Sequence, residues 1–305
     1  LSGANIYTGA TNVAAGTLRA GAASTFSSIS AFTVASGATL DLAGQSQTIA
    51  SMANGGTVSL VGSAPGTTLT VTGPWVGNGG TLRLGTALGA DGSASDRLVL
   101  DGPTAIASGS TTVQVTNLSG LGALTSGNGI EVISARNGAN TTAQTTKSAF
   151  SLAGGHVDAG AYEYRLHAAD AGGAGENWYL RSTTNVVSPV DPVAPSPPDL
   201  PAAPPVVVPT YRAEASLYSA LPSQLRQGSL AMLGDLRKRV GDDDVKGTAT
   251  TPTGSERRAW ARVLSTDLDI RQGGTVSPTS KGRLSGLQAG TDLLATPNWR
   301  AGLYV

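Results

Sequence analysis

The sequence predicts an all-β fold: a right-handed parallel β-helix with a cap, followed by a Pro-rich linker, one helix and a few further strands. Three observations support this prediction: a glycine-plus-aliphatic repeat near twenty residues, a scarcity of bulky and charged residues, and a change of period after residue 210. The 305 residues include 41 Gly and only 3 Phe, and 13% of them are charged. Such a composition suits short strands joined by tight turns.

Residues 1–96 repeat one pattern, in which a glycine and one or two small residues precede an aliphatic residue that opens an alternating stretch. Period-two alternation indicates half-buried strands. Four of the aliphatic residues are spaced 22, 18 and 24 positions apart, namely Leu18, Leu40, Val58 and Leu82. A period near 20 indicates a solenoid whose coils stack on one another. A β-sandwich with Gly-rich turns is the alternative, but the spacing fits a full coil better than a hairpin.

Residues 97–184 are expected to cap the open end of this stack, because an exposed sheet edge leaves backbone N–H and C=O groups unpaired. Alternation predicts strands around residues 97–100, 111–115, 129–133, 161–166 and 177–181. Aromatic residues concentrate here, and large rings bury more area per residue than other side chains do. The candidates for a folding nucleus are therefore Tyr162, Tyr164, Trp178 and Tyr179.

Residues 185–210 contain nine of the sixteen prolines and are predicted to form an extended, semi-rigid spacer. An SH3 ligand is the alternative, which the absence of flanking basic residues disfavours. In residues 211–247, apolar residues at three- and four-residue steps predict a helix from about Ser223 to Arg239. Its polar side chains are incompatible with lipid, so a polar lumen is the environment that suits it.

Residues 248–305 alternate apolar and polar side chains, as the strands of outer-membrane barrels do. The 45 residues after Trp260 give room for three or four such strands. Closing a barrel takes about eight strands. The sequence therefore predicts only the start of a barrel, and a chain that is a fragment.

These parts, in this order, resemble a type Va autotransporter with a pertactin-like passenger. The segments similar to the family's autochaperone region are 116–130, 159–164 and 178–182. Residues 211–222 and 236–242 resemble the approach to the pore helix and its end, and residues 259–263 and 286–293 resemble the opening barrel strands. The resemblance implies an autochaperone cap, then a pore helix, then the start of the autotransporter barrel.

The resemblance also implies a function, namely secretion and surface display of a β-helical passenger. The barrel inserts into the outer membrane of a Gram-negative cell, and the passenger crosses unfolded and folds outside, beginning at its C-terminal part. The implied partners are outer-membrane lipid, the barrel-assembly machinery, periplasmic chaperones and a host surface ligand that the sequence does not identify. The chain has no cysteine, which agrees with threading through a pore and excludes disulfides and thiolate metal sites.

Some members of this family cut the passenger from the barrel at an Asn-Asn pair inside the pore helix. At the matching place this chain has Gly234 and Asp235, so cyclisation of an asparagine is not available at the first position. Asp235 retains the atoms for cyclisation, but a solvated helical aspartate is the favoured interpretation.

No catalytic residue, cofactor-binding residue or metal ligand is expected, and the chain is predicted not to be an enzyme. His156 and His167 fit surface or turn positions, and Asp91 and Asp96 fit a polar turn better than a calcium loop. The formal net charge of zero excludes nucleic-acid binding through bulk positive charge.

The passenger is expected to be an adhesin or another virulence factor, because long solenoids present a large contact surface. One alternative is the same module beneath an upstream protease or esterase. Another is a free-standing β-helix that binds glycans, against which the barrel-like strands argue.

Overall fold

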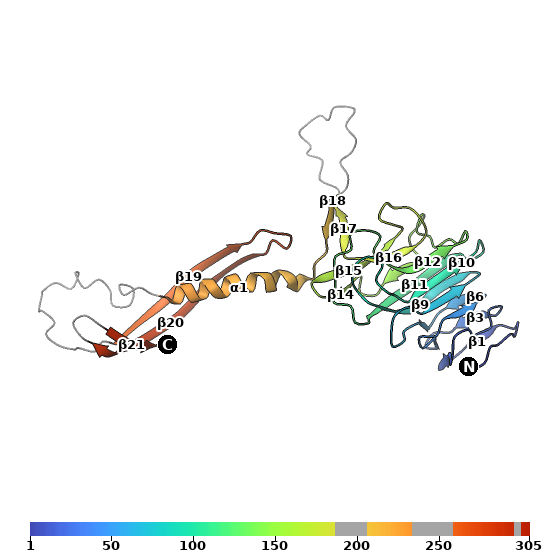
Figure 1. The fold of residues 1–305 in the computed structure, drawn as a ribbon, viewed down its shortest axis with the longest axis horizontal. Helices are drawn as coiled ribbons and strands as arrows, with labels where there is room; N and C mark the ends of the chain where they lie inside the picture. The colour runs from blue at the N-terminus through green and yellow to red at the C-terminus, as the bar shows by residue number, and fades with distance from the viewer. Residues whose placement is uncertain (187–205, 234–258, 296–299) are drawn as a thin grey trace, which may run out of the picture. The chain divides into compact units, whose positions relative to one another are not determined.

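A computed structural model of the chain describes residues 1–186, 206–233, 259–295 and 300–305 (Figure 1). The chain divides into two compact units, Leu1–Arg212 and Ala213–Val305. Each unit is described by itself below.

The first unit begins as a stack of parallel strands arranged in three rows. The first row contains β1 (Thr11–Val13), β3 (Ala31–Val34), β6 (Ser51–Asn54) and the start of β9 (Trp75–Thr86). The second contains β2 (Thr17–Arg19), β4 (Thr39–Asp41), β7 (Thr57–Ser59) and the remainder of β9. The third contains β5 (Gln47–Ile49), β8 (Thr68–Val71), β10 (Arg97–Asp101) and β12 (Ile130–Arg136).

Two further strands extend the stack. β11 (Ala107–Asn117) pairs in parallel with β9 along almost its whole length (Figure 1). β13 (Phe150–Leu152) then pairs with β11. Three parallel rows, each built from successive turns of the chain, make a parallel β-helix. The prediction of an all-β fold with a parallel β-helix is confirmed.

The repeat in the sequence is a column of stacked side chains in the structure. Leu18 pairs in register with Leu40, Leu40 with Val58, Val58 with Leu82, and Leu82 with Val113. All of them except Leu18 are fully buried. Burying a side chain of this size stabilises the fold by about 1.5–3 kcal/mol. Each coil thus adds one aliphatic rung to a continuous core.

The parallel pairing continues past the boundary expected at residue 97. Leu98 of β10 pairs in register with Leu69 of β8 and with Ile133 of β12. Antiparallel pairing begins at β16 (Trp178–Arg181), which lies between β12 and β15 (Tyr162–Ala168), with β14 (Val157–Ala159) beyond. These three strands, here called the antiparallel cap, cover the edge of the third row, whose backbone groups would otherwise lack partners.

The Pro-rich segment leaves and rejoins the first unit at neighbouring points. β17 (Thr183–Val186) pairs antiparallel with β18 (Val206–Pro209), and Val186 is the register partner of Val206. Residues 187–205 lie outside the described residues. The predicted spacer falls mostly on these residues, and the strands on its two sides are hydrogen-bonded to each other.

The second unit contains one helix, α1 (Ala213–Met232). It begins ten residues before the expected start at Ser223 and includes Pro222. Proline favours a helix start through its fixed φ. Residues 213–221, however, are rich in Ala, Leu and Glu, which are strong helix formers. The expected end, at residues 234–239, lies outside the described residues.

Three antiparallel strands accompany this helix: β19 (Ala259–Arg271), β20 (Thr279–Ala295) and β21 (Arg300–Tyr304). Val263 and Leu287 are cross-strand partners and are 80% and 70% exposed. The neighbouring pair, Arg262 and Gln288, points the other way, and Arg262 Nε donates to Gln288 Oε1 at 2.7 Å. Side chains along each strand therefore alternate between the two faces, and the face that carries Arg262 also carries Leu268 and Ile270, which line a pocket with α1.

Within the described ranges of both units, no helix has the length and apolar character needed to cross a membrane.

Candidate functional site

The three segments that resemble an autochaperone region meet in the first unit. Tyr164 of β15 is fully buried, and its hydroxyl oxygen lies 2.9 Å from the carbonyl of Gly89 and 2.8 Å from that of Ala123. The same oxygen accepts a hydrogen bond from the Ala123 N–H at 2.8 Å. Burial raises the pKa of Tyr164, so the hydroxyl remains a donor. One side chain thereby ties the antiparallel cap to two separate loops.

A second link joins β16 and β17 to the loop at residue 125. The Ser182 N–H donates to Thr125 Oγ1 at 2.9 Å, and the Thr125 N–H donates to Ser182 Oγ at 2.9 Å. Neither residue is exposed. Nearby, Gly122 has φ +76° and approaches Ala159 so closely that a Cβ would lie 2.0 Å from the Ala159 carbonyl oxygen. Only glycine fits there.

Trp178 of β16 connects the sheet of the third row to β13, which extends the second row. Its side chain is 3% exposed, and its Nε1–H donates to Thr141 Oγ1 at 2.9 Å. The ring meets Phe150 of β13 edge-on, with centroids 5.5 Å apart and an interplanar angle of 75°. Glu176 fixes the same loop by accepting hydrogen bonds from the N–H groups of Thr141 and Ala143, at 2.9 and 3.0 Å. Trp178 therefore packs between two sheets.

The other two candidate residues lie further out. Tyr179 is 8% exposed, lies beneath the Arg181 guanidinium at 5.5 Å and accepts a hydrogen bond from Asn177 Nδ2 at 3.2 Å. Tyr162 is half-buried and stacks on Tyr211, with centroids 5.4 Å apart. The structure thus places Tyr164 and Trp178 at the centre of the cap and Tyr162 at its outer edge.

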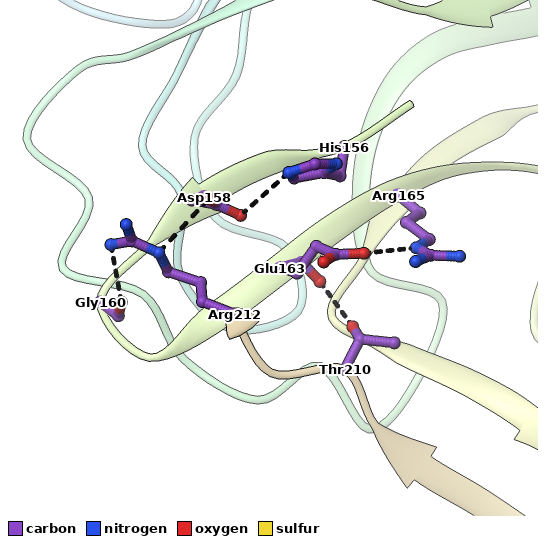
Figure 2. Close-up of polar contacts among 7 residues, drawn as sticks. All are labelled: His156, Asp158, Gly160, Glu163, Arg165, Thr210 and Arg212. Atoms are coloured by element: carbon purple, nitrogen blue, oxygen red, sulfur yellow. Dashed lines mark hydrogen bonds and ion pairs between the residues drawn. The ribbon is translucent and has the colours of Figure 1, made fainter. Parts of the chain in front are cut away.

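Residues 210–212 fold back onto the hairpin of β14 and β15 (Figure 2). The Glu163 N–H donates to the Thr210 carbonyl at 3.0 Å, and the Arg212 N–H donates to the Ala161 carbonyl at 3.1 Å. Arg212 Nε also lies 3.3 Å from Asp158 Oδ2. The chain is therefore held to the cap up to the last residue of the first unit.

His156, Asp158 and Glu163 bring three potential metal-ligand atoms within 4.8 Å of one another. Each carboxylate already has a cationic partner: Asp158 pairs with Arg212, and Glu163 pairs with Arg165 at 2.6 Å (Figure 2). A metal ion would have to compete with both guanidinium groups. The cluster acts here as an ion-pair network that holds the hairpin and the exit segment together.

Asp91 and Asp96 accept hydrogen bonds from backbone N–H groups of distant loops. The predicted polar turn did not indicate these contacts. Asp91 accepts hydrogen bonds from the N–H groups of Ser126, Gly127 and Gly129 at 2.7, 3.0 and 2.7 Å. Burial opposes ionisation of Asp91, but these bonds together lower its pKa below the usual value.

Asp96 is fully buried and accepts from the N–H groups of Gly66, Thr67 and Gly85. For this carboxyl, burial outweighs the same kind of hydrogen bonds and raises the pKa. The partners of Asp96 lie 11 to 30 residues away in the sequence. No local pattern could have indicated them.

The two histidines differ in environment. His156 is exposed, and its Nε2 lies 3.9 Å from Asp158 Oδ1. His167 of β15 is half-buried, and its Nε2 has no hydrogen-bond partner in the described part of the chain. Burial, together with the charges of Arg181 and Arg165, lowers the pKa of His167 to about 4. Gly234 and Asp235, the candidate cleavage positions, lie outside the described residues.

Residues 48–166 match the protein family described as Autochaperone Domain Type 1. The matched range covers the last coils of the stack and the first two strands of the cap.

Comparison with curated proteins adds three relatives. The chain is 34% identical over 251 residues to the uncharacterized protein YdeU of Escherichia coli K12, a match that covers 79% of the chain and 49% of YdeU. It is 37% identical over 182 residues to the adhesin BmaC autotransporter of Brucella suis biovar 1, covering 57% of the chain and 5% of that protein. The probable autotransporter YfaL of E. coli K12 is 44% identical over 145 residues, which is 47% of the chain and 10% of YfaL.

A parallel β-helix that ends in a cap, a match to an autochaperone family and relatives named as autotransporters define one class of protein. The chain is an autotransporter passenger with an autochaperone region. Such proteins belong to the outer membrane, with the passenger exposed at the cell surface or secreted. The chain spans about half the length, or less, of the curated relatives it matches.

Proposed function

We propose that the antiparallel cap is the folding nucleus of the passenger. It folds first outside the cell, and β16 then offers its edge as a template for β12, the last strand of the third row. The observation that carries this proposal is the set of buried side-chain bonds that tie the cap to distant loops. The longest links residues 75 positions apart, from Tyr164 to Gly89. Once such contacts have formed, each further coil needs contacts only with its neighbour.

The second unit is proposed to be the pore helix and the opening strands of the autotransporter barrel. The polar contacts of α1 with its own sheet support this assignment: Gln224 Nε2 donates to Ser280 Oγ at 2.6 Å, and Arg262 donates to the Met232 carbonyl at 2.8 Å. The opposite face of the sheet carries the exposed pair Val263 and Leu287. Outer-membrane lipid and the barrel-assembly machinery are the partners that this role requires.

The passenger is proposed to act as an adhesin and not as an enzyme. The relative from Brucella suis is named an adhesin. The described residues of the first unit make long stacked sheets, which suit contact with another surface. A test is adherence of cells that display the passenger to host cells, compared with cells that display a copy lacking residues 1–96. Equal adherence of the two strains would contradict a binding role for these coils.

Surface display tests the folding nucleus. The full-length protein that contains this chain would be expressed as wild type, as Trp178→Ala and as Leu40→Ala. Both substitutions remove a fully or almost fully buried side chain, one in the cap and one in an upstream coil. We expect Trp178→Ala to reduce the amount of folded passenger at the surface several-fold more than Leu40→Ala does, measured by surface immunostaining and protease resistance. Equal display of the two variants would contradict the proposal.

A further inference from the structure

A pocket of about 270 Å³ lies in the first unit, beside the cap. Polar residues from four separate segments line it: Ser126 from a loop, His167 from β15, Arg181 from β16, and Thr183 and Thr184 from β17. Pockets for drug-sized ligands start near 300 Å³. This pocket therefore suits a small ligand, and five of its eight lining residues carry polar side chains.

Arg181 is the main charge of this pocket and is 8% exposed. Its Nε–H donates to the Asn128 carbonyl at 2.8 Å, and one Nη2–H donates to the Ala169 carbonyl at 2.6 Å. A guanidinium has five N–H donors, so three remain after these two bonds. No carboxylate among the described residues comes within ion-pair distance of Arg181, and both of these hydrogen bonds go to backbone carbonyls.

His167 faces the same side of the sheet as Arg181. In the pairing of β15 with β16, His167 lies opposite Tyr179, and Arg165 lies opposite Arg181. Because side chains two residues apart share a face, these four project to one side. His167 Nε2 is buried without a hydrogen-bond partner in the described residues, and it lines the pocket. An unsatisfied buried nitrogen is costly unless a ligand supplies the missing bond.

We propose that this pocket binds a phosphate or sulfate group, either as the free ion or as an ester on a sugar. Arg181 supplies the charge and a planar fork of donors, for which phosphate is a preferred partner. His167 lines the pocket from β15, and Thr183 and Thr184 line it from β17. Donors on several sides fit a tetrahedral oxyanion better than a planar carboxylate. Binding would supply the missing partner of His167 and an anion in direct contact with Arg181.

The charged and titratable groups around His167 are known. Arg165 lies on its own strand, Tyr179 and Arg181 lie on β16, and the carboxylates of Asp91 and Asp170 act on Arg181 from nearby loops. The two arginines and burial keep His167 neutral near pH 7. A bound dianion reverses this effect, since an opposite charge close to an imidazole favours its protonated form. Binding therefore couples to the protonation of one identifiable residue.

The test is an NMR titration of the two imidazoles, which are the only histidine signals of the 305-residue chain. The pH would be varied with and without inorganic phosphate, with sodium chloride matching the ionic strength. We expect phosphate to raise the midpoint of His167 by at least one pH unit, in a saturable manner, and to leave exposed His156 almost unchanged. Equal movement of both midpoints, or no movement of His167, would overturn the proposal.

Two further probes distinguish the source of the group. Inorganic sulfate that acts like phosphate, with no effect of glucose 6-phosphate, would identify a free-ion site. Tighter saturation by glucose 6-phosphate would identify an esterified ligand. Acetate that saturates the site as well as phosphate does would overturn the tetrahedral assignment.

Variants separate binding from folding. Arg181→Lys keeps the charge but loses the fork, and we expect it to weaken phosphate binding about tenfold or more. His167→Gln keeps a donor but cannot titrate, so sulfate, which is a dianion throughout this range, should bind it without dependence on pH between 4 and 7. His156→Gln is the matched control, with unchanged affinity. Near-ultraviolet circular dichroism shows whether each variant is folded. Full affinity in both pocket variants would reject the site.

Discussion

The coils of the first unit and its antiparallel cap are stabilised in different ways. In the coils, identical positions stack: Leu40, Val58 and Leu82 occupy one column, and each contacts its counterpart one turn away. In the cap, each important side chain has a unique partner far away in the sequence, such as Tyr164 with Gly89 or Trp178 with Thr141. A coil with repeated contacts can add to any stable edge of the stack. The specific contacts of the cap form at one place only, and they therefore determine where folding starts. The predictions below test this contrast.

The largest expected effect is on folding kinetics. Trp178→Ala removes the contact with Phe150 and the donor to Thr141, and we expect it to lower the free energy of unfolding by about 3–5 kcal/mol. If the cap is the nucleus, most of this loss slows refolding. Leu40→Ala should cost about 2–5 kcal/mol and mainly accelerate unfolding. Denaturant-jump kinetics followed by far-ultraviolet circular dichroism measure both rates. Changes confined to unfolding in both variants would remove the distinction between cap and coils.

The next effect is a dependence on pH that arises in the cap. The folded-state pKa of His167 is about 4, below the ordinary value of 6.5, so the unfolded chain takes up a proton before the folded chain does. Stability is therefore lost as the pH falls from about 7 to 4. At 1.36 kcal/mol per pKa unit, and reduced for partial exposure, the loss is on the order of 2–3 kcal/mol. Urea midpoints at pH 7 and 4.5 measure it.

His167→Gln should remove most of this pH dependence, and His156→Gln, in the exposed position, should leave it intact. Identical pH profiles for wild type and His167→Gln would show that other groups cause the acid sensitivity.

A smaller effect comes from the hydroxyl of Tyr164. Tyr164→Phe keeps the buried ring but leaves the Gly89 carbonyl and the Ala123 N–H and carbonyl without this partner. The expected loss is about 1–3 kcal/mol, the cost of leaving buried polar groups unsatisfied. Thermal unfolding of the variant measures it. An unchanged midpoint would mean that water or a neighbouring group replaces the hydroxyl.

The smallest effect is expected at the exit segment. Arg212 and Asp158 form an ion pair of 3.3 Å in which both side chains are about one third exposed, at 38% and 31%. Exposed pairs of this kind contribute less than about 1 kcal/mol. Arg212→Ala should therefore shift the urea midpoint only slightly, and added salt should reduce the difference further. A loss as large as that of Tyr164→Phe would show that residues 210–212 are integral to the cap.

The parts of the fold that depend on repetition could be predicted from the sequence. The spacing of Leu18, Leu40, Val58 and Leu82 gave the register of one row to the residue. It could not separate the rows, however: Leu69 shares the glycine-plus-aliphatic pattern but stacks on Leu98 in the third row. A local pattern indicates a strand, but the turn geometry between strands decides which face of the coil that strand occupies.

The candidate site was predictable only in part, for the same reason. Aromatic content indicated Tyr164 and Trp178, because large rings need burial. The carboxylates of Asp91, Asp96 and Glu176 bind backbone N–H groups of distant loops, and backbone donors leave no trace in a sequence. Tyr211 and Arg212 likewise contact the hairpin of β14 and β15 through tertiary structure. The pairing of β18 with β17 brings them there.

The pairing of Val186 with Val206 also determines how a mechanical load travels along the chain. A pull applied at Ala213 reaches the hydrogen bonds of residues 206–212 before it reaches any proline between 187 and 205. Changing the length of that segment alters the size of a closed loop, at about 0.6 kcal/mol per doubling, and leaves the anchor point where it is. The hydrogen bonds between β17 and β18, and not the number of prolines, therefore resist a pull applied at Ala213.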